Sequence, residues 1–270
     1  MRSTRLILSA VTLYKLQNLL MITTAGCFPV RDSVPVSVID CTLDWPRYSN
    51  RFRDVFPDSE IFKAMKQEFP ENPEIVVITG STTSVYEDEE WIDALVEKTR
   101  EYIEDDVPVL GVCFGHQIIA KAMDAEVVQM DDYEIGYREI NFDDTEIFRG
   151  LRESEYPFST HQDRVEEVPE KMERIAETDI CVQGIKHTEK PVYGVQFHPE
   201  LTPGIAKKAI RTKNFSEERE ERLMDEVNEE NFERAKRTLK IFDNFQRIAE
   251  RQVSARKVER GIRGRRKSGA

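Results

Sequence analysis

The sequence predicts an α/β fold of three layers, in which helices cover both faces of a mostly parallel central sheet and a helical extension follows. Three observations predict it. Short apolar runs alternate with helix-like segments between residues 34 and 123. Residues 126–200 consist of short alternating segments that are typical of strands, and apolar residues recur every three to five positions from Met224 to Ile248. The strand, helix, strand order implies parallel neighbours joined by right-handed crossovers.

The first expected elements lie between residues 34 and 80. VPVSVID (34–40) is typical of a short buried strand, and SNRFRDVF (49–56) is typical of a helix, with Ser49 or Asn50 as its capping residue. EIVVITG (74–80) is an apolar, β-branched run that ends in glycine, which indicates a second strand.

The next three elements run from residue 89 to residue 123. EEWIDALVEKTREYI (89–103) has the spacing of an amphipathic helix, and VPVLGVC (107–113) is a third apolar strand. This strand runs directly into FGHQIIAKAM (114–123), which again has helical spacing. The helical stripe near the end of the chain is expected to pack on the α/β body or on a partner.

Composition divides the chain into four expected parts: an N-terminal extension (1–33), the α/β domain (34–205), a helical extension (206–253) and a basic, disordered tail (254–270). Residues 1–31 contain no Asp or Glu. Because Lys15, Gln17 and Asn18 interrupt their apolar run, a surface helix or a misassigned start codon is favoured over an export signal. We therefore expect this segment to be dispensable and expect no membrane attachment.

Charge and cysteine usage exclude several classes of function. The net charge is −12, although residues 251–270 carry eight Lys or Arg against one acid. An acidic body repels nucleic acid, and the basic tail lacks interleaved aromatic residues, so no nucleic-acid partner is expected. The four cysteines are scattered without a CxxC pair, which favours reduced thiols in the cytoplasm and no metal site.

The most informative stretch is Gly-Val-Cys-Phe-Gly-His-Gln (111–117), at the junction of a buried strand and a helix. A residue at such a junction has a strained backbone and an exposed side chain, and the small residues Gly111 and Gly115 let the chain turn sharply. The positive end of the following helix favours the thiolate of Cys113. A buried, inert cysteine would leave the two glycines and Gln117 unexplained, so we interpret Cys113 as a nucleophile.

A cysteine nucleophile needs a base, and the base needs an orienting group. His198 ends the strand-like VYGVQFHPE, and Glu200, two residues later, points the same way. Among the other histidines, His116 is expected to pack on the helix after Cys113 and His187 to lie at the surface, while His161 is a second candidate.

The pair of motifs GVCFGHQ and VQFHPE resembles the class I glutamine amidotransferase domain, as found in the glutaminase part of GMP synthetase. The resemblance covers residues 34–205 and implies a flavodoxin-like fold with Cys113, His198 and Glu200 as the catalytic triad. It implies further roles for residues around the triad: oxyanion stabilisation by backbone N–H groups of Gly80 or Ser81 and of Phe114, and substrate binding by Gln117, Thr160, His161 and Gln162.

Two departures from the family pattern bear on substrate choice. Thr79-Gly80-Ser81 stands where relatives often have Gly-Gly-Pro and resembles members that act alone or as γ-glutamyl peptidases. Gln162 stands where glycine is common, in the segment that holds the amino-acid end of the substrate.

The resemblance implies hydrolysis of the glutamine side-chain amide through a cysteinyl thioester, without cofactor or metal. The chain lacks a phosphate-binding motif of the G-x-x-x-x-G-K type, so a partner that uses ATP must activate any ammonia acceptor. A separate synthetase, such as a GMP synthetase, is therefore favoured over a stand-alone γ-glutamyl hydrolase. A non-catalytic relative is disfavoured because all three triad residues are present.

Overall fold

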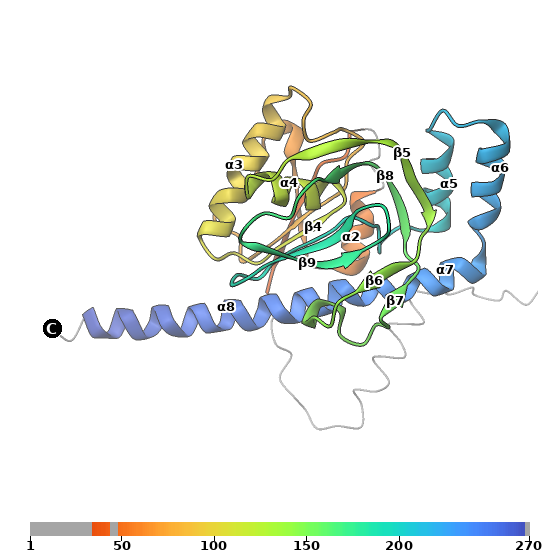
Figure 1. Cartoon of the computed structure of the whole chain (residues 1–270). Coiled ribbons are helices and arrows are strands. Elements are labelled where there is room, and N and C mark those ends of the chain that lie inside the picture. The colour runs from red at the N-terminus through yellow and green to blue at the C-terminus, as the bar shows by residue number, and fades with distance from the viewer. Residues whose placement is uncertain (1–33, 44–47, 268–270) are drawn as a thin grey trace, which may run out of the picture. The chain divides into compact units, whose positions relative to one another are not determined.

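The structure, a computed structural model, describes residues 34–43 and 48–267, and from Val34 onward the chain forms one compact unit (Figure 1). The expected extension (1–33) lies outside the described residues, so the prediction that it is dispensable stays a prediction. None of the helices in the described part has an apolar stretch long enough to cross a bilayer.

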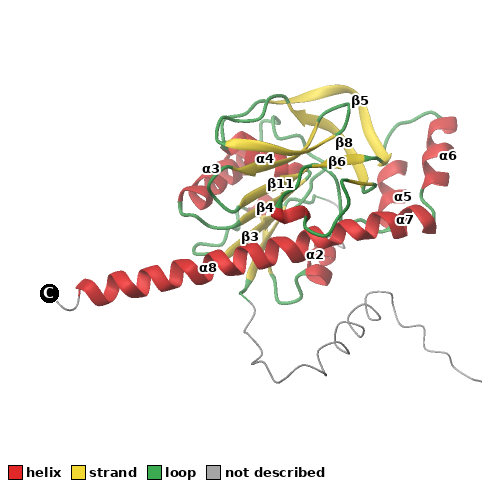
Figure 2. Cartoon of the chain, turned by 60° about the horizontal axis from the view of Figure 1, so that its bottom comes forward, coloured by secondary structure: helices red, strands yellow, loops and turns green. Residues whose placement is uncertain are grey.

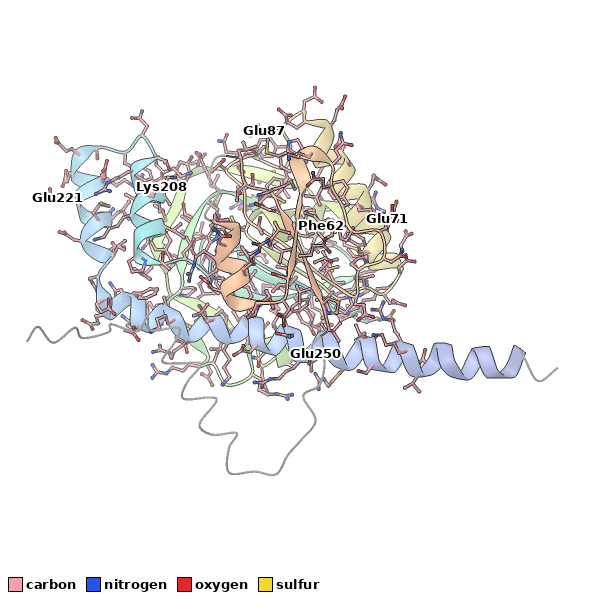
Figure 3. The ribbon with its side chains drawn as sticks, turned by 180° about the vertical axis from the view of Figure 1, so that it is seen from behind. Phe62, Glu71, Glu87, Lys208, Glu221 and Glu250 are labelled. Atoms are coloured by element: carbon pink, nitrogen blue, oxygen red, sulfur yellow. The ribbon has the colours of Figure 1, made fainter. Side chains whose placement is uncertain are left out.

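A nine-stranded sheet forms the centre of the unit. Its first five strands in spatial order, β2, β1, β3, β4 and β11, are mutually parallel, and the remaining neighbours pair antiparallel. The strands in spatial order are β2 Glu60–Lys63, β1 Val36–Asp40, β3 Ile75–Ile78, β4 Val109–Val112, β11 Val192–Val195, β10 Val182–His187, β9 Met172–Glu177, β6 Ile140–Phe142 and β7 Ser154–Glu155. The sequence analysis missed the short edge strand β2, whose Phe62 is labelled in Figure 3.

A second, two-stranded sheet lies beside the first and pairs β5 (Val127–Tyr137) antiparallel with β8 (Phe158–Val165). Together with β6, β7, β9, β10 and β11 it accounts for the strand-rich character expected for residues 126–200.

Helices cover both faces of the central sheet (Figure 2). The α-helices are α2 Ser49–Val55, α3 Glu90–Glu104, α4 Phe114–Ala122, α5 Pro203–Arg211, α6 Glu217–Glu226, α7 Glu229–Ala235 and α8 Lys240–Lys267, and the short 3₁₀ helices are η1 Ala64–Lys66, η2 Glu146–Phe148 and η3 Lys236–Leu239. The predicted fold class, a largely parallel sheet between helical layers with a C-terminal helical extension, is confirmed.

Strand β3 shows how the sequence separates the two layers. Its four residues are completely buried, and successive side chains point to opposite faces because a strand has a period of two. Val76 and Ile78 pack with the apolar residues of α3 and α4. Ile75 and Val77 pack on the other side, with residues of α2 and α8.

The apolar stripe of the C-terminal helices packs on this body. The ring of Phe242 on α8 meets edge to face the rings of Phe52 on α2 and of Phe56 directly after it, at centroid distances of 6.1 and 5.8 Å. The buried Asn244 side chain donates hydrogen bonds to the carbonyls of Ile147 and Arg149, at 2.9 and 3.0 Å. Of the two alternatives, packing on the α/β body is therefore the one observed for these residues.

Two local predictions were wrong. Helix α2 begins at Ser49, so neither Ser49 nor Asn50 caps it, and the N-cap position is held by Tyr48 without a side-chain capping bond. The tail was expected to be disordered from residue 254, but α8 continues to Lys267. Its Arg, Lys and Ala residues are good helix formers, and the packed first turns of α8 supply the nucleus that an isolated tail would lack.

Candidate active site

Cys113 lies at the sharp turn between β4 and α4. Its backbone has φ 53° and ψ −103°, a left-handed conformation that costs a side-chain-bearing residue about 1–3 kcal/mol. The turn is possible because α4 approaches β3 and β4 closely. A Cβ atom on Gly111 would lie 2.2 Å from the carbonyl oxygen of Gly115, and one on Gly115 would lie 2.3 Å from that of Ile78. Both glycines are thus required by the local packing.

His198 and Glu200 lie beside Cys113 at the end of β11. The backbone N–H of His198 donates to the carbonyl of Phe158 at 2.9 Å, which ties this segment to β8. Nδ1 of His198 lies 2.7 Å from Oε1 of Glu200, and both side chains are buried. With Nδ1 engaged by the carboxylate, the other ring nitrogen is left for the Cys113 sulfur.

The charge state of His198 is set by its two neighbours. Burial disfavours the charged ring, but the charges of Cys113 and Glu200, and its hydrogen bonds with both, outweigh burial and raise the pKa of His198 to about 10. The ring is therefore an imidazolium at neutral pH, ready to donate a proton.

Tyr48 is a member of this site that the sequence analysis did not identify. Its hydroxyl donates a short hydrogen bond to Oε1 of Glu200 and lies 3.2 Å from Nδ1 of His198. Burial first, and then the charge of Glu200, raise the pKa of the Tyr48 hydroxyl well above its usual value, so it remains a donor. No local motif marks this residue, because only the fold brings it to residues 198 and 200.

Two glutamines, Gln196 and Gln117, form a chain of hydrogen bonds that ends at the Cys113 sulfur. The side-chain amide of Gln196 donates to Sγ of Cys113 at 3.5 Å, and its carbonyl accepts from the amide of Gln117 at 3.0 Å. The Gln117 amide also donates to the carbonyl of Asp163 at 3.2 Å. A hydrogen bond donated to sulfur favours the thiolate. The structure thus connects Gln117 to the Cys113 sulfur through Gln196, another residue that the sequence analysis missed.

One pocket exposes this site and brings together all but one of the predicted site residues. Its wall contains the loop after β3, the start of α4, the middle of β8 and the end of α5. The predicted residues that line it are Gly80, Ser81, Cys113, Phe114, Gln117, Thr160, His161, Gln162 and His198. Glu200 is the exception, because it lies behind His198 and is 1% exposed.

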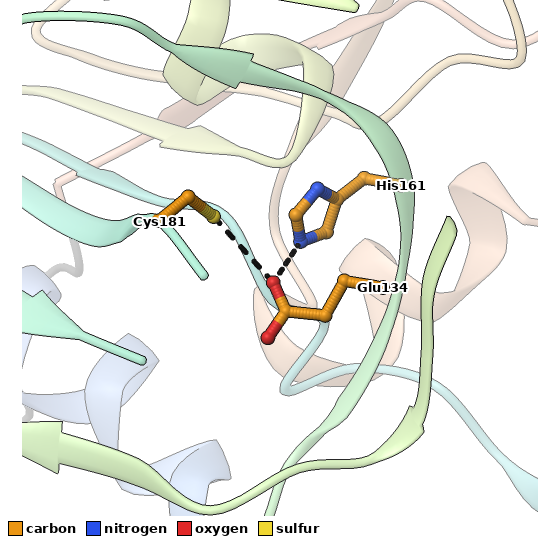
Figure 4. Close-up of side chains that lie close together, drawn as sticks. All are labelled: Glu134, His161 and Cys181. Atoms are coloured by element: carbon orange, nitrogen blue, oxygen red, sulfur yellow. Dashed lines mark hydrogen bonds and ion pairs between the residues drawn. The ribbon is translucent and has the colours of Figure 1, made fainter. Parts of the chain in front are cut away.

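Behind the β8 wall, Glu134, His161 and Cys181 converge (Figure 4). Nδ1–H of His161 donates to the carbonyl of Asp163 at 3.0 Å, which leaves Nε2 3.0 Å from Oε2 of Glu134. Three donors within 4.8 Å of one another could hold a metal ion. However, the amide nitrogen of Gln183 lies between them, 2.7 Å from Oε2 of Glu134 and 3.2 Å from Sγ of Cys181.

These side chains form polar contacts around one oxygen of the Glu134 carboxylate, Oε2, whereas the buried Oε1 has no hydrogen-bond partner. Burial opposes ionisation of Glu134, but the adjacent His161 outweighs burial and lowers the pKa of that carboxyl group. Burial and then the charge of Glu134 raise the pKa of the Cys181 thiol, which stays protonated and donates to the carboxylate at 3.5 Å. The network anchors the strand that carries residues 160–162 into the pocket.

The other two histidines, His116 and His187, do not line the pocket. His116 is fully buried on α4 and packs against Gly194, and burial lowers its pKa to about 3. His187 was expected at the surface, and this was wrong. It is 4% exposed, and its Nδ1 accepts the backbone N–H groups of Glu189 and Lys190 at 3.0 and 3.1 Å, which closes the turn after β10.

Solved structures with the same fold include two proteins at low sequence identity. A putative GMP synthase subunit from Thermoplasma acidophilum matches with TM-score 0.62 and 23% identity, over 85% of this chain and 99% of that one. A glutamine amidotransferase from Thermotoga maritima matches with TM-score 0.64 and 22% identity, over 83% and 99%.

Relatives found by sequence have higher identity, over shorter stretches of the chain. A GMP synthase (glutamine-hydrolyzing) from Clostridium novyi is 36% identical over 157 residues, which are 57% of this chain and 29% of that protein. A GMP synthase (glutamine-hydrolyzing) subunit from Pyrococcus furiosus is 43% identical over 108 residues, 39% of this chain and 57% of that protein. The chain thus spans less than two thirds of either relative. The family model for class-I glutamine amidotransferases matches residues 46–217. The chain belongs to the class-I glutamine amidotransferase family.

Proposed function

We propose that this chain hydrolyses the side-chain amide of glutamine to glutamate and ammonia, with Cys113 as nucleophile, His198 as acid and base, and Glu200 as its orienting group. The observation that carries the proposal is the strained turn at Cys113, whose sulfur meets a buried imidazolium held by a carboxylate. A structural cysteine has no need of either feature.

In the proposed mechanism, the Cys113 thiolate attacks the amide carbon of glutamine and forms a tetrahedral oxyanion. Backbone N–H groups of Gly80 or Ser81 and of Phe114 stabilise the oxyanion. The imidazolium of His198 gives its proton to the amide nitrogen, and ammonia leaves as the C–N bond breaks. The neutral ring then takes a proton from water, which attacks the thioester and releases glutamate, so thiolate and imidazolium are restored.

We assign the amino-acid end of the substrate to the β8 wall of the pocket, with Thr160, His161 and Gln162. We assign Gln117 to positioning the side-chain amide of Gln196, which donates to the Cys113 sulfur. The amidotransferase domain is assigned to residues 34–205, with 206–253 as a helical extension that adds the α5 wall. The free thiols at Cys41, Cys113 and Cys181 suit the reducing cytoplasm, where we place the activity.

We infer that the ammonia passes to a separate ATP-dependent synthetase. Support comes from relatives named GMP synthase (glutamine-hydrolyzing), one of which is a subunit of that enzyme, and from the absence of a phosphate-binding motif in residues 1–270.

The test measures ammonia release by the purified chain from glutamine and from γ-glutamyl peptides, first alone and then with a candidate synthetase, ATP and its acceptor. We expect slow glutamine hydrolysis that the synthetase accelerates. Rapid turnover of γ-glutamyl peptides, with glutamine a poor substrate that no synthetase improves, would replace the amidotransferase by a γ-glutamyl hydrolase that uses the same three residues.

The pH dependence of the reaction should follow the protonation of His198. Because its pKa is about 10, kcat/KM for glutamine should fall on the alkaline side only near pH 10. In the Glu200→Gln variant the alkaline fall of kcat/KM should shift to lower pH, since this variant lacks the negative charge that helps to raise the pKa of His198. The raised pKa also stabilises the fold, fully below the unfolded value near 6.5 and progressively less as the pH rises through 10. An alkaline limb at neutral pH in the wild type would contradict this assignment.

The Tyr48→Phe variant should lower kcat about tenfold and leave KM nearly unchanged, because the lost hydrogen bond orients the His198–Glu200 pair and does not bind substrate. Steady-state kinetics of glutamine hydrolysis measure both constants. Tyr102→Phe is the matched control: its buried hydroxyl also donates one hydrogen bond, to the carbonyl of Pro70, but on the α3 side of the molecule. Equal losses in the two variants would assign Tyr48 a merely structural role.

A further inference from the structure

Besides Cys113 and His198, the pocket wall carries one acidic and two basic side chains, Asp163, His161 and Lys213. The His161 ring is already paired with Glu134, with Nε2 3.0 Å from the carboxylate. Asp163 is already engaged: its carboxylate accepts from the hydroxyls of Ser84 and Tyr86, at 2.6 and 2.8 Å. These two bonds fasten the loop after β3 to strand β8. Lys213 is therefore the charged side chain of the described pocket wall that is left to bind a ligand of opposite charge.

Lys213 follows helix α5 and is held in place without an acidic partner. Its backbone N–H donates to the carbonyl of Ile210 at 3.1 Å, and its Nζ lies over the ring of Tyr133, 4.4 Å from the centroid. It forms no ion pair with any residue in the described part of the chain, although acidic residues outnumber basic ones by 51 to 39 in the sequence. The two other lysines of this region, Lys207 and Lys208, lie outside the pocket wall.

The ring beneath Lys213 is itself fixed by a chain of contacts between β5 and the segment around α6. Tyr133 meets Phe215 edge to face at 5.6 Å, and the guanidinium of Arg219 lies 4.1 Å from the centre of the Phe215 ring. Arg219 also forms an ion pair with Asp132 at 2.9 Å. An ammonium on an aromatic face keeps its N–H groups on the open side available. The helical extension thus presents one preorganised cation to the pocket.

We propose that Lys213 binds the α-carboxylate of the glutamyl substrate, so that the helical extension contributes a residue to the substrate site. This inference rests on the proposed function and specifies it: the substrate must carry a free carboxylate on its glutamyl part. Lysine suits this role because its compact ammonium, held over the Tyr133 ring, keeps N–H donors free for a carboxylate.

The test uses alkylation of Cys113, which needs no partner and no turnover. The diazoketone analogue of glutamine carries the α-carboxylate, whereas iodoacetamide does not, and mass spectrometry of the full-length chain follows both reactions. The Lys213→Met variant should require about tenfold more analogue for half-maximal labelling rate, because it loses one charge-assisted hydrogen bond. Its rate with iodoacetamide should stay at the wild-type value, which also reports that the site is folded.

Two variants complete the design. Lys213→Arg keeps the cation and should restore labelling by the analogue to within a few-fold of wild type. Lys208→Met makes the same charge change on the exposed side of α5, where Figure 3 labels Lys208, and should leave both reactions unchanged. An unchanged analogue requirement in Lys213→Met, or equal slowing of both reagents, overturns the inference. A wild-type chain that reacts with iodoacetamide but not with the analogue overturns the proposed function, and this inference with it.

Discussion

Replacing Cys113 with alanine should lower glutamine hydrolysis by at least about 10⁴-fold and abolish labelling by an electrophilic glutamine analogue. The loss is large because no other group in the pocket can form the thioester: in the described residues the remaining cysteines, Cys41 and Cys181, do not line it. The variant should fold normally, since alanine fits the same turn at the same backbone cost. Ammonia release and intact mass after labelling are the measurements.

The matched controls are Cys41→Ala and Cys181→Ala, which remove the other two described thiols one at a time. Cys41 is fully buried and Cys181 donates to Glu134, so each change is expected to cost some stability but to leave labelling at one site per chain. Ammonia release by Cys113→Ala above the background without enzyme would refute the covalent mechanism.

The Gly111→Ala variant should have the largest effect on folding, lowering the free energy of unfolding by at least about 3 kcal/mol or leaving little soluble protein. Its Cβ atom would stand 2.2 Å from the carbonyl oxygen of Gly115 and 2.6 Å from the backbone nitrogen of His116. These are backbone atoms, so relief requires a shift of α4 away from β4. Urea denaturation followed by circular dichroism measures the change.

Gly204→Ala serves as the comparison for this variant. Gly204 lies in α5, and a Cβ atom there would meet nothing within 4 Å. Alanine is the better helix former, so this variant should be as stable as wild type or more stable by up to about 1 kcal/mol. A Gly111→Ala protein with wild-type stability would show that the approach of α4 to β4 is looser than described.

The sequence predicted those features that depend on neighbours along the chain. Fully apolar runs such as Ile75–Ile78 mark strands that are buried on both faces, and they led to the correct fold class. The turn at Cys113 was also accessible, because the two glycines that permit it lie two residues to either side. The roles of Cys113, His198 and Glu200 remain a prediction that the kinetic experiments test.

Residues whose environment is made by distant segments escaped prediction. Tyr48 reaches Glu200 only because α2 packs beside the end of β11, and Lys213 faces the pocket only because α6 is fastened to β5. His187 looked exposed among polar neighbours, yet it is buried because its ring nitrogen satisfies two backbone N–H groups of a turn. In each case a hydrogen bond or ring contact between separate elements overrides the local pattern.

The packing of Phe242 against Phe52 and Phe56 has a consequence for biosynthesis. Phe52 and Phe56 leave the ribosome early, whereas the ring that covers them belongs to α8, almost 190 residues later in the sequence. Until α8 is made, this apolar face of the nascent protein is open to aggregation or to a chaperone. The same holds for any fragment cut at residue 217, where the family match ends. The core of this unit is therefore completed by a helix that lies beyond the residues the family model matches.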